Sequence, residues 1–361
     1  MAMTHYYVDA SGGNDTTGDG SSGNPWATVQ KAWNTITRNS TDGDQVNCKD
    51  NATHTLAAAL TLATYGTPSD AAPAHLRGYT TTANDGGRAT ISGAGSYAIW
   101  ASSYSNVHLT DLRLTNTGAN AVVTLNSGVH MTSVEVDTST SNGVDLGNEA
   151  EVIDCNVHDV AGSYALKIGT GQSKNCTVED TTSTAAFRGG SGTRINNCVA
   201  SVSGAQYAVF IVGSNFEVSG CSLWSNAGTG VGIKVNSAYN RLRIYNNIIQ
   251  GFSGAGGKGV DAPSGTKIAL YGYNRFYNNT TNENMTGVIT IVDLGNTTTL
   301  SAGAFTNPGS DDFSVTTELK AAAWPASFRG LSTNNYLDAG AAQREEPTGG
   351  GRRSRGRYHG V

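Results

Sequence analysis

The strongest constraint on the fold is a set of cysteines that recurs at nearly constant intervals. Cys155, Cys176, Cys198 and Cys221 are separated by 21, 22 and 23 residues. Repetition with a period of about 20 to 50 residues is typical of solenoids, in which each repeat forms one coil. The same step continues on both sides of the cysteines at Ile91, Leu112, Val134, Asn247 and Asn274. The spacing therefore predicts one elongated stack of coils instead of several globular domains.

The apolar pattern inside each repeat indicates three short β-strands. An apolar residue such as Val157 stands two positions after the cysteine, and residues i and i+2 lie on one face of a strand. A polar residue that tolerates left-handed backbone, such as Asn175, precedes the cysteine and predicts a corner. Triplets with apolar residues at the first and third positions, such as 129–131 and 144–146, supply the other two strands. We therefore predict an all-β, single-stranded parallel β-helix, and the general preference of crossover connections makes it right-handed.

Both ends of a solenoid need a cover, and the sequence suggests one for each. Asn24-Pro25, followed by an apolar helical face, predicts a short capping helix at the N-terminus. Near the other end the periodicity fades, and aromatic residues such as Phe305 and Phe313 are expected to cover the last coil. The predicted organisation is an N-terminal cap (1–43), a parallel β-helix (44–298), an irregular C-terminal cap (299–346) and a Gly- and Arg-rich tail (347–361).

Three segments carry a resemblance to a known superfamily. Residues 6–33, 43–54 and 71–79 resemble the entry of right-handed parallel β-helix proteins of the pectin-lyase-like superfamily. Residues 336–345 are similar to a closing segment of β-helix proteins from bacteria and phages. The resemblance implies a fold but no single function, because this fold hosts lyases, glycosidases, tailspikes and structural proteins. The Gly-His-Gly and Arg-Ile-Lys motifs of polygalacturonases are absent.

Charge and hydropathy exclude several classes of partner. The net charge is −5, from 23 basic and 28 acidic residues, so an acidic body gives no support for nucleic-acid binding. No apolar run is long enough to span a bilayer, and no export signal is visible at the N-terminus, so neither membrane insertion nor secretion is expected. No CxxC pair occurs, and we expect no cofactor.

The resemblance implies that polysaccharide chemistry would lie on the sheet formed by the third strand of each coil. Asp145, Lys167 and Arg188 should lie on three successive coils of that sheet, about 4.8 Å apart. A uronate lyase needs a cation for the substrate carboxylate and a base for the C5 proton, and Lys167 and Arg188 could supply them. The alternative, which we favour, is an ion-pair ladder in which Asp145 bonds to Lys167. The same outward column supplies the candidate glycan-binding residues Trp100, Phe210, Lys234 and Asp261.

A second group of residues, on the strand that precedes the corner in each coil, has the side chains of a metal site. His108, His130 and Glu151 follow one another at 22 and 21 residues. Two imidazoles and a carboxylate could hold a divalent cation, but stacked coils place ligands in a line and not around a centre. We therefore expect a solvated face and no bound metal, with these three residues as weak candidates.

Two functions from different classes fit the sequence. The favoured hypothesis is a non-catalytic structural subunit of a phage-like virion, such as a capsid decoration, spike or fibre, which could bind host surface polysaccharide. The alternative is a polysaccharide lyase of tailspike type that acts on an acidic polysaccharide. The missing export signal and motif set favour the structural hypothesis, which places the chain in a virion and allows a homo-oligomer. The basic tail is expected to dock on other virion subunits through Arg352, Arg353, Arg355, Arg357 and Tyr358.

Overall fold

The fold is seen in a computed structural model of the 361-residue chain. The structure describes residues 3–36, 43–60, 69, 72–93, 100–101, 106–116, 122–203, 206–226, 228–295, 297–310 and 312–315. The predicted docking residues in the tail 347–361, and most of the predicted cap 299–346, lie outside this part of the chain.

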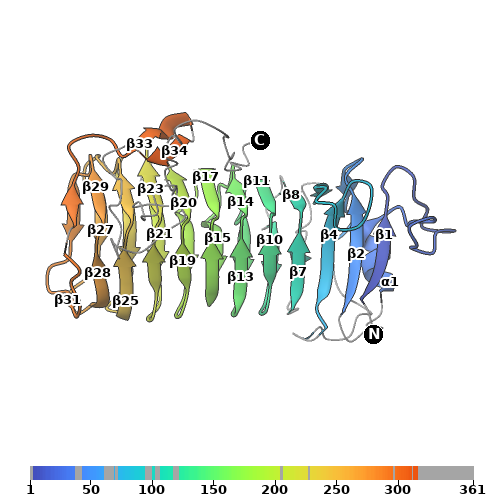
Figure 1. The fold of residues 1–361 in the computed structure, drawn as a ribbon, viewed down its shortest axis with the longest axis horizontal. Coiled ribbons are helices and arrows are strands. Elements are labelled where there is room, and N and C mark those ends of the chain that lie inside the picture. Colours follow the sequence, from blue (N-terminus) through green and yellow to red (C-terminus); the bar gives the residue numbers. More distant parts are fainter. Residues whose placement is uncertain are drawn as a thin grey trace, which may run out of the picture.

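Three long parallel sheets run side by side along the molecule, and each coil from β4 to β30 contributes one strand to each sheet (Figure 1). Sheet 1 has twelve strands: β1 (Thr4–Val8), β2 (Asp44–Lys49), β4 (Ala74–Tyr79), β7 (Val107–Thr110), β10 (His130–Thr132), β13 (Ala150–Ile153), β16 (Gly171–Lys174), β19 (Arg194–Asn196), β22 (Glu217–Ser219), β25 (Asn240–Tyr245), β28 (Lys267–Gly272) and β31 (Ile289–Thr290). Sheet 2 has eleven strands: β3 (His54–Thr55), β5 (Ala89–Ser92), β8 (Leu112–Asn116), β11 (Glu135–Ser139), β14 (Asn156–His158), β17 (Thr177–Thr181), β20 (Val199–Val202), β23 (Ser222–Ser225), β26 (Ile248–Gln250), β29 (Arg275–Tyr277) and β32 (Thr298–Thr299). Sheet 3 has nine strands: β6 (Trp100–Ala101), β9 (Val123–Leu125), β12 (Val144–Leu146), β15 (Tyr164–Ile168), β18 (Ala185–Gly189), β21 (Tyr207–Ile211), β24 (Val231–Val235), β27 (Lys258–Asp261) and β30 (Thr281–Asn284). The predicted parallel β-helix, with one chain and three short strands per coil, is confirmed.

The corner between sheets 1 and 2 is a single residue in the left-handed backbone region, as the sequence predicts. Such residues have φ between 53° and 63° and include Asp111, Ser133, Asp154, Asn175, Asn197, Gly220 and Asn246. Because one residue turns the chain, the strands on either side keep a fixed register. Most residues of these strands therefore pair with their equivalents one coil later, apart from local register shifts between β8 and β11, between β17 and β20 and between β25 and β28.

The predicted cysteine column lies inside the solenoid. Cys155, Cys176, Cys198 and Cys221 are buried and free of disulfides, so they fill the core as small apolar side chains. The column continues as an amide ladder, in which Asn247 Nδ2 donates to Asn274 Oδ1 at 3.0 Å. Asparagine can replace cysteine in this buried column because the donors and acceptors of its amide find hydrogen-bond partners inside the stack.

The N-terminal cap contains the predicted short helix, with a later start than expected. Helix α1 spans Val29–Thr35, and Thr28, not Asn24, is its N-cap, with the Thr28 side chain accepting from Lys31 N at 3.1 Å. Val29, Ala32 and Trp33 are buried and join the first coils in the apolar core. Among the helices of the described residues, none combines the length and hydropathy that a membrane crossing needs.

The expectation that Phe305 and Phe313 cover the last coil is wrong. The antiparallel strands β33 (Phe305–Asn307) and β34 (Asp312–Val315), joined through the 3₁₀ turn Pro308–Ser310, lie against the outer side of sheet 2 (Figure 1). Their phenyl rings pack with Ile248 and Trp224, apolar side chains on the strands of sheet 2. These outward apolar positions need a cover, which explains why the hairpin lies there. At the end of the stack, Ile289 of strand β31 remains 53% exposed.

Candidate functional site

The outward face of sheet 3 carries a continuous column of polar and aromatic side chains. Lys167 pairs in register with Asp145 on one side and with Arg188 on the other, and Arg188 pairs with Phe210. The column continues through Lys234 to Asp261. Residues between these positions, such as Leu166 and Ile168, are buried in the core, so the alternation of the strands turns the column outward. The predicted column is confirmed from residue 124 to residue 261.

The membership of Trp100 in this column stays a prediction. The backbone register pairs Trp100 with Val123 and pairs Ala101, not Trp100, with Thr124. The side chains of residues 100 and 101 lie outside the part of the chain that the structure describes.

Lys167 is engaged by Asp145. Its ammonium lies 2.7 Å from Asp145 Oδ1 and 2.8 Å from Oδ2, and both side chains are largely covered. This is the ion-pair ladder that the sequence favoured. An amine held by both oxygens of a carboxylate is not open to take a proton from a substrate.

A second ion-pair cluster surrounds Asp261. Its carboxylate accepts from Lys234 at 2.5 Å, from Lys258 at 3.1 Å and from Asn284 at 2.5 Å. Burial alone would raise the pKa of Asp261, but these hydrogen bonds outweigh it and the net shift is downward. Two predicted glycan-binding residues, Lys234 and Asp261, therefore neutralise each other.

Arg188, between these two pairs, has different surroundings. Its guanidinium lies over the ring of Tyr164, with Cζ 4.8 Å from the ring centroid. Its Nε is buried and makes no hydrogen bond, and among the residues that the structure describes no carboxylate pairs with it. On the next coil, the rings of Tyr207 and Phe210 stack with centroids 5.2 Å apart. We call Tyr164, Arg188, Tyr207 and Phe210 the arginine–aromatic cluster.

Sequence reasoning missed the two tyrosines of this cluster. In β21, Tyr207 and Phe210 both face outward, because Ala208 and Val209 between them are both buried. A strict two-residue alternation would send Tyr207 inward. The presence of an aromatic residue three positions before an outward site, as at Tyr164 and Lys167, was the available signal.

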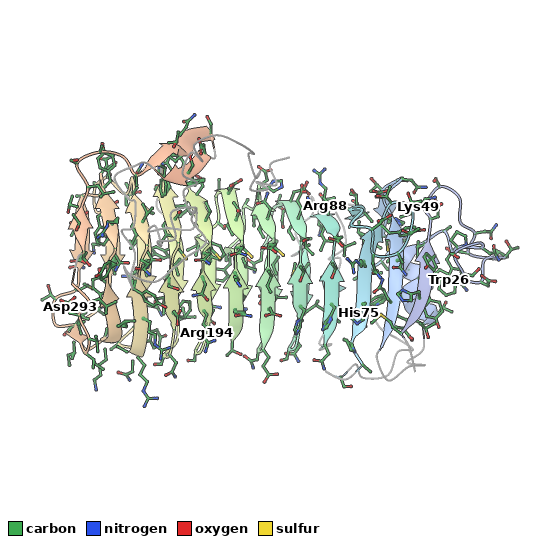
Figure 2. The ribbon with its side chains drawn as sticks, viewed as in Figure 1. Trp26, Lys49, His75, Arg88, Arg194 and Asp293 are labelled. Carbon is green, nitrogen blue, oxygen red and sulfur yellow. The ribbon has the colours of Figure 1, made fainter. Side chains whose placement is uncertain are left out.

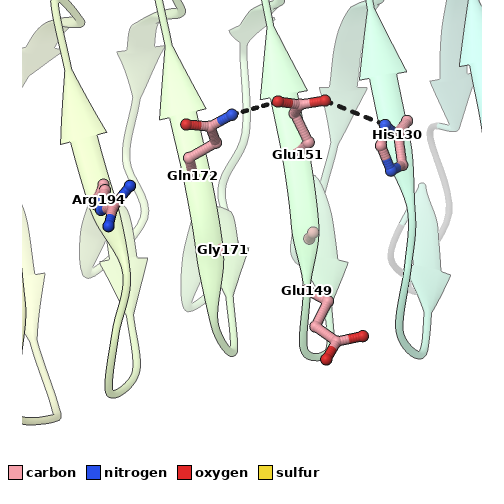
Figure 3. A pocket seen from close by; sticks show the side chains of 7 residues that line it. His130, Glu149, Glu151, Gly171, Gln172 and Arg194 are labelled. Atoms are coloured by element: carbon pink, nitrogen blue, oxygen red, sulfur yellow. Dashed lines mark hydrogen bonds and ion pairs between the residues drawn. The ribbon is translucent and has the colours of Figure 1, made fainter.

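Sheet 1 carries a shallow depression between β10 and β19 (Figure 3). Its floor includes Gly171, where the backbone φ is +131° and a Cβ would lie 1.9 Å from the carbonyl oxygen of Ala150. His130 Nδ1 lies 3.1 Å from Glu151 Oε2, and Gln172 Nε2 donates to the other oxygen of Glu151. Two of the predicted weak metal candidates, His130 and Glu151, are thus in contact, and the ring of His108 lies 4.4 Å from that of His130.

On sheet 2, three potential metal ligands converge, a set that the sequence did not single out. Donor atoms of Glu135, Asp137 and His158 lie within 4.8 Å of one another. Arginines already occupy this place: Arg113 Nε donates to Asp137 at 2.9 Å, and Arg88 lies 2.7 Å from Glu135. We therefore interpret the set as an ion-pair network, in which basic side chains neutralise both carboxylates.

His158 is itself a cation in this network. Its hydrogen bond to Glu135 raises the pKa of His158 to about 9 against the effect of burial, with Asp159 assisting. The same hydrogen bond lowers the pKa of Glu135 to about 2 despite burial, with Arg113 and Arg88 assisting. A metal ion would have to displace this proton, so the hydrogen bonds of His158 disfavour metal binding at neutral pH.

Comparison with known proteins finds a match at the level of structure only. No family model matches the chain, and no curated protein does. The crystal structure of pectate lyase Pel9A superposes with a TM-score of 0.68, at 15% identity, over 96% of this chain and 98% of that one.

The chain has the right-handed parallel β-helix fold of pectin-lyase-like proteins.

A rhamnogalacturonan lyase (TM-score 0.39, 12% identity, 75% of this chain and 87% of that one) is a more distant match. So is the GH136 lacto-N-biosidase from Eubacterium ramulus (TM-score 0.39, 12% identity, 82% and 67%). At these identities the likeness extends to the fold alone, so function must come from the side chains of this β-helix. The relation to phage proteins stays a prediction.

Proposed function

We propose that the outward face of sheet 3 binds an acidic polysaccharide and holds it without cleaving it. The observation that carries the proposal is the environment of Arg188. Its guanidinium lies over an aromatic ring, on a face where the neighbouring lysines, Lys167 and Lys234, are already neutralised by aspartates. A guanidinium free of carboxylates has its donors available for a ligand.

The chemistry of the arginine–aromatic cluster suits a uronic-acid residue. Arginine binds carboxylates through two parallel N–H···O bonds, which gives a directed and charge-assisted contact. Aromatic rings around a few polar groups are typical of sites for small organic groups, and the apolar faces of sugar rings pack on such rings. Tyr207 and Phe210 lie one coil beyond Arg188, about 4.8 Å along the axis, so carboxylate and ring contacts could fall on one chain of sugars.

A lyase reaction has less support from the same geometry. Lys167, one of the two residues that the sequence suggested for the roles of cation and base, is held by both oxygens of Asp145. A guanidinium with five N–H donors is better suited to holding a substrate carboxylate than to removing a proton. Binding without cleavage agrees with the structural class of function that the sequence favours, and a virion spike or decoration is the setting we propose for it.

The test compares binding and cleavage on the same polymer. Calorimetric titration with polygalacturonate should show saturable binding, and neutral dextran should show none. Arg188→Ala should weaken binding at least about tenfold, or about 1.4 kcal/mol, while Arg188→Lys should keep part of it, since a lysine retains the charge without the fork. Arg243→Ala removes an exposed arginine from sheet 1 and serves as the matched control.

Two outcomes would contradict the proposal. If wild type and Arg188→Ala bind the acidic polymer equally, the arginine–aromatic cluster is not the site. If incubation releases unsaturated sugar ends that absorb in the ultraviolet, the protein is a lyase, and Lys167→Ala would then show whether this lysine takes part.

A further inference from the structure

Three histidines of sheet 1 form a column on successive coils, on a face separate from the arginine–aromatic cluster. His75, His108 and His130 pair in register on β4, β7 and β10. The ring centroids of His75 and His108 are 4.6 Å apart at 81°, and those of His108 and His130 are 4.4 Å apart at 35°. Figure 2 labels His75 at the N-terminal end of this column.

The ring of His130 is oriented by a carboxylate. Its Nδ1 lies 3.1 Å from Glu151 Oε2, and Gln172 fixes Glu151 from the other side (Figure 3). In metal sites a ligating histidine almost always gives one ring N–H to a carboxylate or carbonyl, which leaves the other nitrogen for the metal. The pairing of His130 and Glu151 has this form, with Nε2 as the remaining nitrogen.

His108 is held against two other histidine rings. The ring of His75 lies edge-on against it, and the ring of His130 lies tilted against it. These neighbours limit the orientations that His108 can take. A restricted ring binds a metal ion with little loss of conformational freedom.

We propose that His108 and His130 form a two-imidazole clamp for a borderline divalent cation such as Zn²⁺, with Glu151 as the positioning residue. Imidazole nitrogens favour zinc, copper and nickel over calcium or magnesium. Two nitrogens on one tetrahedral zinc ion are about 3.3 Å apart, since each Zn–N bond is about 2.0 Å. The centroids of the two rings are 4.4 Å apart, so small rotations of the side chains would bring one nitrogen of each ring to that spacing. Water would complete the coordination.

The linear arrangement of stacked coils limits the clamp to two protein nitrogens. A third ligand from the same column would be about two coil steps, or about 9.6 Å, from the first. We therefore expect a weaker site than a structural zinc centre of three or four protein ligands. The sequence alone favoured no bound metal, because stacked ligands lie in a line; the proposal differs in that two adjacent histidines suffice.

The test is calorimetric titration of the full, tag-free chain with ZnCl₂ and NiCl₂ at pH 7.5. Wild type should bind one cation saturably. His108→Ala and His130→Ala should each weaken binding at least about tenfold, and Glu151→Gln should weaken it less. His5→Ala removes a histidine from the same sheet, two strands before His75, and should bind as tightly as wild type.

Three results would overturn the proposal: no saturable binding by wild type, unchanged binding in both histidine variants, or an equal loss in His5→Ala. Unchanged binding in Glu151→Gln would remove the positioning role. The histidines lie on the outer surface, so the fold should survive substitution. His108→Gln and His130→Gln keep a polar side chain of similar size and repeat the test if an alanine variant does not fold.

Discussion

At the residue scale, the outer surface of this β-helix is organised by contacts between equivalent positions of adjacent coils. Parallel register places such residues about 4.8 Å apart, so opposite charges on neighbouring coils meet directly. Lys167 with Asp145, and Arg113 with Glu135, are pairs of this kind. Exposed pairs contribute little to stability. A charged side chain that has no such partner on the neighbouring coils keeps its donors available to a ligand. Arg188 is such a side chain.

The ion-pair network of sheet 2 should make stability depend on pH in two windows. The pKa of His158 is raised from 6.5 to about 9, so its contribution is complete below 6.5 and disappears as pH rises to 9. The pKa of Glu135 is lowered from 4.5 to about 2, so its contribution is complete above 4.5 and disappears as pH falls to 2. We expect wild type to lose on the order of 1 to 3 kcal/mol of unfolding free energy between pH 6.5 and 9.5.

Urea denaturation at both pH values measures this loss. His158→Gln should be less stable than wild type at pH 6.5 and should show a smaller change between the two pH values. An equal change in wild type and His158→Gln would assign the pH dependence to other groups.

The cysteine column gives a second prediction at this scale. Cys176 is fully buried, so Cys176→Asp would place a charge in the core and should unfold the middle coils, whereas Cys176→Ala should cost only about 1 to 2 kcal/mol. A thiol reagent should label the four column cysteines slowly in the native protein and rapidly in denaturant. Fast native labelling of all four would contradict their burial.

At the scale of single elements, sequence predicted the strands and corners because their physical signals are local. Alternation fixes which face of a strand is buried, and one left-handed residue such as Asn175 fixes the turn. Prediction failed where local signals end. The position of Phe313 depends on which distant surface needs an apolar cover, and the backbone register of Trp100 is one residue away from the expected pairing with Thr124.

Glycines at the corners test how tightly the coils pack. Gly171→Ala should destabilise the protein by more than about 2 kcal/mol, because φ is +131° and the new Cβ would clash with the carbonyl of Ala150. Gly192→Ala is the matched control: its φ is +79° and no atom lies within 4 Å of the Cβ position, so only the backbone cost of about 1 to 2 kcal/mol applies. Thermal unfolding of both variants should rank them in this order, and equal midpoints would contradict the clash at Gly171.

The C-terminal hairpin should detach without unfolding the solenoid. Phe313 is buried against Phe305 and Trp224, outside the main core. Phe313→Ala should therefore increase protease cleavage within residues 300–315 and leave the main unfolding transition of the coils almost unchanged. A large fall in the main transition would mean that the hairpin stabilises the whole stack.

At the scale of the whole molecule, the fold is a one-dimensional array in which each coil contacts mainly its neighbours. The stability of such an array is close to the sum of coil and interface contributions. Its sides can then carry separate sites, such as the proposed glycan face on sheet 3 and the proposed cation clamp on sheet 1, with little coupling between them. The sequence could predict the array but not these sites, since their side chains come from coils about 22 residues apart.

The basic tail remains a prediction at this scale. Residues 347–361 have no apolar periodicity, so deleting them should leave the thermal midpoint of the isolated chain unchanged. If the tail docks on virion subunits, the truncated chain should no longer co-sediment with particles that the full chain joins. Incorporation of the truncated chain at the wild-type level would show that attachment uses another surface.

The single-residue corner has a consequence for how such a chain can change length during evolution. Joining Asp154 directly to the residue after Asn175 would remove one complete coil and keep the order of inward and outward positions in every remaining strand. Removing one residue within a strand would instead exchange its two faces and place charges in the core. Homologues should therefore differ in length by whole coils, or by loops of any size between sheets 2 and 3 and between sheets 3 and 1, while the corner between sheets 1 and 2 keeps its single residue.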